Sequence, residues 1–311
     1  MMNDSEADDG VALALAAWWE ANARDLPWRF GRATPWGILV SEVMSQQTQM
    51  SRVVPYWTAW MAKWPDARAL AGAPKAEVIT AWGRLGYPRR ALRLQECAQV
   101  VTNRYDDELP RTYDELVALP GVGDYTASAV LSFAYGRRVA VLDTNIRRVL
   151  SRVFCGQESL GGSASPLERE MAWRLLPEDL PSRRVSRAKG GVAPSVTWNQ
   201  SIMELGALVC TAKSPLCGQC PLAEWCAFFR AGCPGLGQRR TRPRQRFQGT
   251  DRQVRGLVLG ALRELPAGET LSRERVEGLW EDRAQLTSCV ASLDDDGLIE
   301  ILPNGSLRLP Q

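Results

Sequence analysis

Four cysteines lie within seventeen residues, from Cys210 to Cys226, with six, two and five residues between them. Clustered cysteines in a cytoplasmic chain are typical of metal ligands rather than of disulfides. Because the chain contains no histidine, the candidate groups are a zinc ion held by four thiolates and an iron–sulfur cluster. Zinc sites usually pair two short C-x2-C knuckles, whereas only Cys217 and Cys220 form one here, so the unequal spacing favours a cluster. Cys233 is the alternative to Cys226 as the fourth ligand.

A carboxyl group, Glu42, lies in the apolar segment GILVSEVM. Ser45, Gln46 and Gln49 follow it at i+3, i+4 and i+7, so a helix over residues 35–50 would carry one polar stripe. Most helical glutamates are simply solvated, but a polar stripe on an otherwise apolar helix favours a side chain that faces a pocket. A carboxyl group partly removed from water has a raised pKa and can act as a general acid.

A second carboxyl group, Asp143, ends the apolar run in VAVLDTNIRRVL. A helix is predicted to begin just after it, so Asp143 is expected near the N-cap. It is either a plain cap or a carboxylate that the helix dipole keeps ionised. One protonated and one ionised carboxyl group form the pair that cleaves glycosidic bonds.

The segment LPGVGDYTASAV, Leu119 to Val130, joins two predicted helices through Gly121 and Gly123. Two glycines allow main-chain amides to turn outward at a helix N-terminus, which makes an anion site. A plain helix–helix turn is the alternative. Leu-Pro before the glycines and a helix of small residues after them favour a helix-hairpin-helix, which grips the DNA backbone without reading sequence.

The elements that position these residues are predicted to be helical almost throughout residues 1–235, which gives a mainly α fold class. Residues 236–250 are expected to form a basic linker, and its arginines are either solvated or bind phosphate. Residues 251–311 are a small separate domain, in which helical patterns lead to LIEILPNGSLRLP, a predicted hairpin with its turn at Asn304-Gly305. Helices followed by a hairpin predict a winged-helix-like shape.

Composition narrows the class of protein. The hydrophobic fraction of 45% suits a packed core, and no apolar run is long enough to cross a bilayer. The N-terminus, MMNDSEADDG, is too acidic and polar for a signal or transit peptide, so we expect a cytoplasmic protein with no membrane partner. Without histidine, acid–base chemistry must use Asp, Glu, Tyr, Lys or Cys.

These motifs together resemble the helix-hairpin-helix DNA glycosylases of the endonuclease III superfamily. The cysteine spacing is similar to that of the [4Fe–4S] loop of these enzymes. SEVMSQQTQ and LDTNIRRVL closely resemble the two catalytic segments of the adenine-specific MutY branch. The resemblance covers roughly residues 20–230. It implies a six-helix barrel over about 35–143 and an iron–sulfur module made of residues 1–34 and 144–235.

The resemblance implies a mechanism. Glu42 protonates adenine, the N-glycosidic bond breaks through an oxocarbenium-like sugar cation, and Asp143 stabilises or captures that cation while Asn145 orders Asp143 and the sugar. Lyases of the superfamily carry a Schiff-base lysine in the helix after the hairpin, where this chain has Tyr125. The resemblance therefore implies a monofunctional glycosylase without strand cleavage. The lysines of the chain are Lys63, Lys75, Lys189 and Lys213.

Other positions are carried over as contacts to DNA or to the target base. They are Trp28, Arg29, Gln47, Thr48, Tyr87, Gly121, Gly123 and Gln200. Trp28 and Arg29 resemble adenine-pocket residues, and Gln200 an adenine-edge contact. Gln47 and Tyr87 resemble residues wedged into the duplex, which an enzyme that takes its target base out of the stack requires. The family often has a second tyrosine where this chain has Pro88.

The resemblance also implies the cofactor and the partner. Cys210, Cys217, Cys220 and Cys226 would hold a [4Fe–4S] cluster that mainly supports a DNA-facing loop. The expected substrate is double-stranded DNA with adenine opposite 8-oxoguanine or guanine, acted on by a monomer that is nucleoid-associated. Many relatives read 8-oxoguanine with a Nudix-like domain, for which residues 251–311 are too short.

Two other functions remain open. One is a thymine or uracil mismatch glycosylase on the same fold, against which Glu42 argues, because protonating a purine needs an acid at that position. The other is a non-catalytic iron–sulfur DNA-binding protein, against which the presence of both Glu42 and Asp143 argues.

Overall fold

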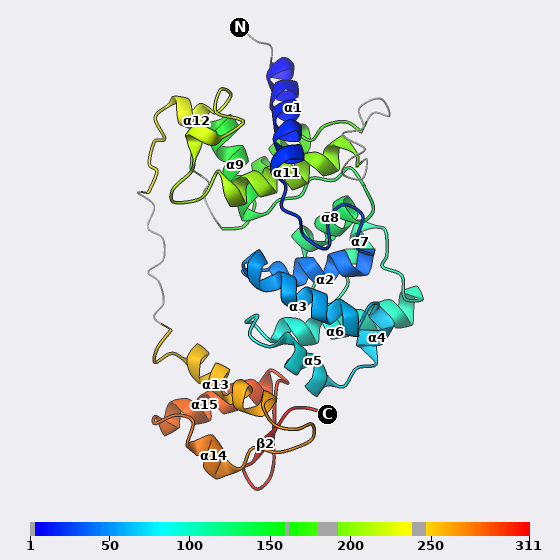
Figure 1. The fold of residues 1–311 in the computed structure, drawn as a ribbon, viewed down its shortest axis with the longest axis vertical. Helices are drawn as coiled ribbons and strands as arrows, with labels where there is room; N and C mark the ends of the chain where they lie inside the picture. Colours follow the sequence, from blue (N-terminus) through cyan, green and yellow to red (C-terminus); the bar gives the residue numbers. More distant parts are fainter. Residues whose placement is uncertain (1–3, 159–161, 180–191, 238–246) are drawn as a thin grey trace. The chain divides into compact units, whose positions relative to one another are not determined.

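The structure, a computed structural model, describes residues 4–158, 162–179, 192–237 and 247–311 (Figure 1). Helices α1 to α15 make up most of this part of the chain, and its strands are the short β1 and β2, so the mainly α fold class is confirmed. None of the described helices combines the length and the apolarity needed to cross a bilayer. Most of the predicted linker, residues 238–246, lies outside the described residues.

The chain divides into two compact units, each described here by itself. Unit 1 comprises residues 1–39, 111–118 and 122–241, and unit 2 comprises residues 40–110, 119–121 and 242–311. The boundary between them passes through α2 (Pro35–Ser45). The domain boundaries expected from the sequence stay a prediction.

Unit 1 packs around the amphipathic helix α9 (Thr144–Cys155). The helices of unit 1 are α1 (Asp4–Asn22), the first turns of α2, α7 (Tyr113–Val117), α8 (Asp124–Phe133), α9, α10 (Pro166–Arg174), α11 (Pro194–Leu208) and α12 (Ala227–Arg230). In α9 the buried residues Ile146, Val149, Leu150 and Val153 recur every three or four residues, which gives the helix a single apolar face. That face packs on α11 and α12, and α1 packs on α11 as well (Figure 1).

Unit 2 contains a helical part with a tryptophan-rich core. Its helices are the end of α2, α3 (Met50–Lys63), α4 (Ala67–Ala71), α5 (Lys75–Trp82) and α6 (Arg89–Tyr105). The ring of Trp60 lies 4.7 Å from that of Trp64 and 5.6 Å from that of Trp82, both edge-on. Edge-to-face pairs at these distances are favourable beyond the area they bury. They join α3 to α5. Trp82 Nε1 also donates to the main-chain oxygen of Gly86, in the loop that precedes α6, at 2.9 Å.

The rest of unit 2 is a C-terminal module, residues 251–311. It consists of α13 (Asp251–Arg263), α14 (Arg273–Glu277), α15 (Arg283–Asp295), β1 (Glu300–Ile301) and β2 (Leu307–Arg308). The two strands are antiparallel, and Gly305 has a φ of +78° in the turn between them. The hairpin predicted around Asn304-Gly305 is therefore confirmed, and the order of elements is winged-helix-like.

The apolar core of the C-terminal module includes a residue of the helical part of unit 2. Ile79 of α5 is fully buried in the same apolar cluster as Val254, Val258 and Leu293 of the module. The guanidinium of Arg263 donates from Nε to the main-chain oxygen of Ile79 at 3.1 Å. These contacts seat the module on the helical part of unit 2.

Candidate functional site

Glu42 lies near the end of α2 and is 9% exposed. The helix predicted over residues 35–50 is wrong in its last turns, because α2 ends at Ser45 and α3 begins only at Met50. Gln49 is the N-cap of α3, so it does not continue the polar stripe of Glu42. The burial expected for Glu42 is present, since most of the residues around it in α2 are buried and apolar.

The two residues expected to wedge into DNA share an unusual backbone. Gln47, in the turn after α2, has a φ of +54°, and Tyr87, before α6, has a φ of +48°. Left-handed conformations are uncommon for residues other than glycine, and they concentrate at functional sites. Both side chains are exposed, Tyr87 by 52%. The left-handed residue at position 47 is the physical reason that α2 stops early.

One arginine ties these two loops together. Arg90, in the first turn of α6, donates from Nη1 to the main-chain oxygens of Val43 at 2.7 Å and Gln46 at 2.8 Å. Its Nη2 donates to Thr48 Oγ1 at 3.3 Å and to the main-chain oxygen of Gly86 at 3.2 Å. The guanidinium therefore satisfies carbonyl groups that the end of α2 leaves without partners. Burial lowers the pKa of Arg90.

The predicted hairpin joins α7 to α8. Gly121 has a φ of +77°, and a Cβ there would lie 3.1 Å from Arg93 Cβ, so the position requires glycine. Gly123, the N-cap of α8, has an extended backbone that any residue adopts. A Cβ on Gly123 would meet no atom within 4 Å, so glycine is needed there only if something outside the chain approaches. Tyr125 is the second residue of α8 and is half-buried against the core of unit 1.

Asp143 is the N-cap of α9, as predicted. Its Oδ1 accepts from the main-chain N–H of Ile146 at 2.6 Å, and its Oδ2 accepts from Asn145 Nδ2 at 2.9 Å. Burial is the largest influence on this carboxyl group and raises its pKa, while these hydrogen bonds and the charge of Arg148 act in the opposite direction. The helix N-terminus was expected to keep Asp143 ionised, but desolvation works against it.

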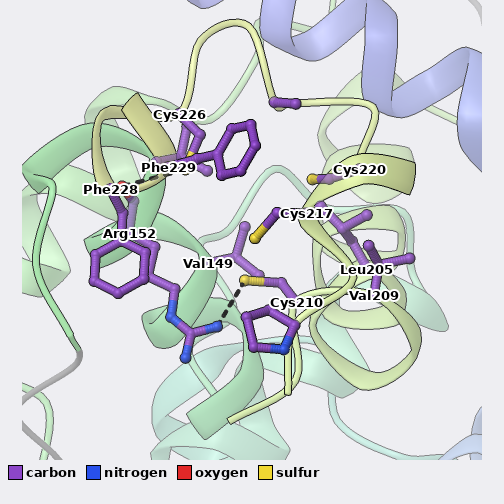
Figure 2. A pocket seen from close by; sticks show the side chains of 13 residues that line it. Val149, Arg152, Leu205, Val209, Cys210, Cys217, Cys220, Cys226, Phe228 and Phe229 are labelled. Carbon is purple, nitrogen blue, oxygen red and sulfur yellow. Dashed lines mark hydrogen bonds between the residues drawn. The ribbon is translucent and has the colours of Figure 1, made fainter. Parts of the chain in front are cut away.

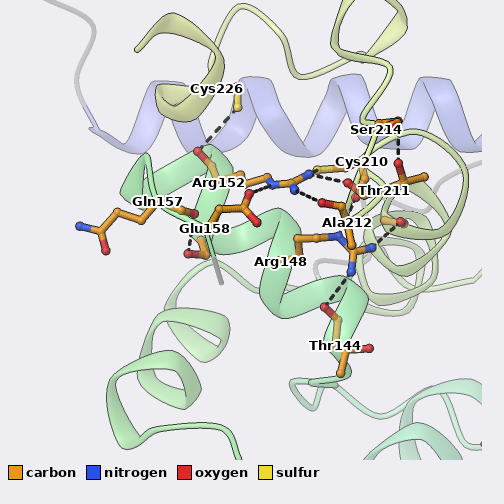
Figure 3. Close-up of polar contacts among 12 residues, drawn as sticks. Thr144, Arg148, Arg152, Gln157, Glu158, Cys210, Thr211, Ala212, Ser214 and Cys226 are labelled. Atoms are coloured by element: carbon orange, nitrogen blue, oxygen red, sulfur yellow. Dashed lines mark hydrogen bonds and ion pairs between the residues drawn. The ribbon is translucent and has the colours of Figure 1, made fainter. Parts of the chain in front are cut away.

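Arg148 connects this carboxylate to the cysteine loop, and sequence reasoning missed it. Its Nη2 donates to Asn145 Oδ1 at 2.7 Å and to the main-chain oxygen of Gly206 at 2.6 Å. Its Nε donates to the main-chain oxygen of Cys210 at 2.7 Å (Figure 3). Gly206 permits this close approach of α11 and α9, because a Cβ there would lie 2.7 Å from Asn145 Cβ.

The four predicted ligand cysteines line one cavity (Figure 2). Its other walls are mostly apolar and include Val149, Leu205 and Phe228. Arg152 of α9, 1% exposed, donates from Nη1 to Cys210 Sγ at 3.3 Å and to the main-chain oxygen of Thr211 at 2.8 Å. These hydrogen bonds fix the position of Cys210 at the wall of the cavity.

The four cysteines come from one loop and line the same cavity, an arrangement that fits one metal group shared by all of them. Burial raises the pKa of Cys217 and of Cys220 to about 11, so both must lose protons to bind metal. Cys233 does not line the cavity, although its thiol is within hydrogen-bond reach of Cys217.

The residues expected to form the adenine pocket lie beside a buried ion pair that sequence reasoning missed. Arg29, 9% exposed, makes two parallel hydrogen bonds to Glu204 of α11, at 3.0 and 2.9 Å. Arg24 adds three more bonds to the same carboxylate, and these partners, against the effect of burial, lower the pKa of Glu204 to about 2. Trp28 is buried, and Gln200 lies one turn before Glu204 in α11. The signal available in the sequence was an isolated glutamate in the apolar run SIMELGALV.

Comparison with known proteins identifies two family models in the chain. Residues 40–175 match the HhH-GPD superfamily base excision DNA repair protein. Residues 210–226, which begin and end at predicted ligands, match the iron–sulfur binding domain of endonuclease III. The second match confirms the predicted cofactor, a [4Fe–4S] cluster.

Whole-chain relatives extend the match. The chain is 46% identical over 299 residues to the adenine DNA glycosylase of Mycolicibacterium smegmatis, covering 96% of this chain and 95% of the relative. It is 44% identical to that of Mycobacterium tuberculosis, covering 95% of this chain and 92% of the relative. A solved thermostable thymine-DNA glycosylase superposes with a TM-score of 0.63 at 26% identity, covering 73% of this chain and 98% of that one. This chain therefore belongs to the adenine DNA glycosylases, within the HhH-GPD superfamily of base excision DNA repair proteins.

Proposed function

We propose that this protein is a monofunctional glycosylase that hydrolyses the N-glycosidic bond of adenine mispaired with 8-oxoguanine or guanine in double-stranded DNA. The observation that carries the proposal is the setting of Asp143, a half-buried carboxylate whose two oxygens are oriented by Ile146 N–H and Asn145. The names of the curated relatives support adenine as the base.

Glu42 is the proposed general acid. It protonates adenine, which turns the base into a neutral leaving group as the bond to the sugar breaks. The cation that develops on the sugar is stabilised, or captured, by Asp143. Asn145 holds one oxygen of Asp143 in place, because its amide donates to that oxygen while its own carbonyl accepts from Arg148. Water completes the hydrolysis.

The cysteine loop has a structural role in this proposal. Cys210, Cys217, Cys220 and Cys226 hold the [4Fe–4S] cluster, which supplies cross-links within the loop when bound. The loop is joined to the Asp143 segment through Arg148, whose guanidinium bonds to Cys210 and Asn145.

Strand cleavage is not expected from this enzyme. A lyase needs an amine at the sugar to form a Schiff base, and position 125, in the first turn of α8, is a tyrosine. Lys63 lies in α3, Lys75 in α5 and Lys213 in the exposed cysteine loop, and Lys189 is outside the described residues.

The remaining residues are proposed to hold DNA, with the protein acting as a monomer. Gly121 makes the tight turn of the hairpin, and Gly123 leaves room for a DNA phosphate at the N-terminus of α8. Gln47, Thr48 and Tyr87 occupy the space vacated when adenine leaves the stack. Trp28, Arg29 and Gln200 surround the displaced base.

Single-turnover base release from four duplexes tests the proposal. The duplexes carry adenine opposite 8-oxoguanine, guanine or thymine, and thymine opposite guanine, and abasic sites are revealed by alkali. We expect adenine release from the two mispairs, none from the adenine–thymine pair, and no strand break before alkali treatment. Glu42→Gln serves as the inactive control. Release of thymine, or of no base, contradicts the proposal, and a strand break without alkali contradicts its monofunctional character.

A further inference from the structure

The ring of Tyr87 is contacted from the C-terminal module. The guanidinium carbon of Arg252, in the first turn of α13, lies 5.6 Å from the centre of the Tyr87 ring. The guanidinium of Arg90 lies 5.7 Å from the same ring. A Cβ on Gly86 would lie 3.9 Å from an Arg252 nitrogen, so Arg252 also reaches the main chain of this loop. The exposed ring of Tyr87 therefore contacts two cations, Arg90 from the helical part of unit 2 and Arg252 from the C-terminal module.

The position of Arg252 is fixed by the seating of the module. Ile79 of α5 shares a core with Val254 and Val258, which are two and six residues after Arg252 in α13. Asp296 of the module forms ion pairs with Arg255 of α13 and, at 3.2 Å, with Arg89 of α6. Arg89 is two residues after Tyr87, so the module is held directly beside the Tyr87 loop.

Exposed arginines lie in the loop that carries Tyr87 and in the helices that contact this loop. Arg52, Arg84 and Arg252 are exposed, and the guanidinium of Arg52 donates to the main-chain oxygen of Arg84. Arg252 forms no ion pair with a carboxylate of the described residues. A guanidinium that stacks on a ring keeps the N–H groups at its edge available for a second partner. A phosphate is the partner that such a flat donor edge fits best.

We propose that the C-terminal module is part of the DNA-binding surface, with Arg252 donating to a backbone phosphate beside the nucleotide that Tyr87 contacts. The partner is duplex DNA, and the inference deepens the proposed function, on which it rests for the contact of Tyr87 with DNA. In this proposal the C-terminal module takes no part in bond cleavage. It adds one contact to a DNA phosphate and restricts the movement of the Tyr87 side chain.

Duplex affinity of the full-length holoprotein tests this inference. The probe is a labelled duplex with 2′-fluoro-2′-deoxyadenosine opposite 8-oxoguanine, whose fluorine resists formation of the sugar cation, and Kd is measured over a series of salt concentrations. Arg252→Ala and Arg252→Gln are compared with Arg275→Ala, which removes the same charge from an exposed position in α14. Thermal unfolding and single-turnover adenine release at saturating protein are measured for each variant.

Both Arg252 variants are expected to weaken binding by roughly tenfold, the low end for a hydrogen bond to a charged group. The slope of log Kd against log salt is expected to fall by about one, as for the loss of one phosphate contact. Arg275→Ala is expected to bind like the wild type and to release adenine at the wild-type rate. Affinities of the Arg252 variants equal to that of Arg275→Ala overturn the inference.

The two proposals fail separately. If the wild type releases no adenine from the unmodified mispair, the proposed function is wrong, and the affinity series still decides whether Arg252 contacts DNA. If adenine is released and the Arg252 variants keep the wild-type affinity and salt slope, the function stands and the role of the module is wrong. Weaker binding with an unchanged salt slope likewise overturns the phosphate contact.

Discussion

Asp143 and the pair formed by Gln47 and Tyr87 are held in opposite ways. Asp143 is half-buried at the start of a helix, and hydrogen bonds from Ile146 N–H and Asn145 fix its two oxygens. Gln47 and Tyr87 are exposed and have left-handed backbones, and the hydrogen bonds from Arg90 reach the main chain of their loops. One region fixes a functional group, and the other fixes a backbone.

The difference follows from what each region is proposed to do. A group that stabilises a developing charge is effective when its position is set before the reaction and water is excluded. A residue that enters a DNA stack must keep its side chain exposed, so the protein holds it mainly through the main chain of its loop. Changes near Asp143 are therefore expected to alter chemistry or folding, whereas changes near Tyr87 are expected to alter DNA binding.

The largest effect is expected from Asp143→Asn. The amide can still accept the hydrogen bond from Ile146, but it has no charge to oppose the sugar cation. Single-turnover adenine release is expected to fall by at least ~10³-fold, the scale seen when an essential catalytic group is removed. Duplex affinity is expected to stay within a few-fold of the wild type. Substantial excision by this variant would show that Asp143 does not act on the cation.

Glu204 tests whether the region around Asp143 depends on buried charge. Its folded pKa of about 2 lies below the ordinary value of 4.5, so its contribution to stability is present above about pH 4.5 and is lost as the pH falls towards 2. The whole contribution is about 3 kcal/mol. Glu204→Gln is expected to be less stable at pH 7 and to lose less stability than the wild type between pH 5 and pH 3.

The measurement for Glu204 is urea unfolding at each pH, with cluster absorbance used to confirm that both proteins keep their cofactor. Glu277→Gln is the matched control, because Glu277 also pairs with an arginine but on the surface. Exposed pairs contribute little, so the control is expected to follow the wild type. A Glu204→Gln protein with the wild-type pH profile would contradict the assignment.

Local patterns in the sequence predicted the parts of the site that neighbouring residues decide. Asp143 at the N-cap of α9, the hairpin at Gly121 and the turn at Gly305 all follow from rules that act over a few residues. The end of α2 was missed because Arg90, more than forty residues away, satisfies its last carbonyl groups. The ion pair of Glu204 was also missed, because its partners Arg24 and Arg29 lie far from it in the sequence.

The burial of the C-terminal module on Ile79 is also a long-range property. The apolar residues of α13 predict that the helix has a buried face, but not which surface covers it. The contact between Arg252 and Tyr87 depends on that choice. The sequence identified Tyr87 as a candidate DNA contact but not Arg252, whose place beside the Tyr87 ring is visible only in the structure.

Arg90→Met tests the region that carries Gln47 and Tyr87. Methionine keeps much of the apolar stem and removes the guanidinium that donates to the end of α2 and to Gly86. The carbonyl groups left without partners are expected to lower the free energy of unfolding by about 2 to 3 kcal/mol. Affinity for the fluorinated mispair duplex is expected to fall more than the release rate at saturation. Arg93→Ala, an exposed position one turn further along α6, is the control and is expected to change neither.

Equal losses of rate and affinity in Arg90→Met would remove the distinction between the two regions. They would mean that the loops of Gln47 and Tyr87 also set the position of a reacting group. Unchanged affinity would mean that these loops keep their backbone without Arg90.

The smallest of these effects is expected from Gly206→Ala, which probes the packing behind Asp143. The new Cβ would lie 2.7 Å from Asn145 Cβ, so α11 and α9 must separate slightly. Overpacking of this kind costs about 2 kcal/mol, and the rate of adenine release should fall because Asn145 orients Asp143. Gly256→Ala is the matched control, because a Cβ at this helical position in α13 meets nothing within 4 Å. Since alanine favours helix over glycine, the control is expected to be slightly more stable than the wild type, with an unchanged rate. Equal stability and equal rates for the two variants would mean that the close approach at Gly206 does not hold the carboxylate of Asp143 in place.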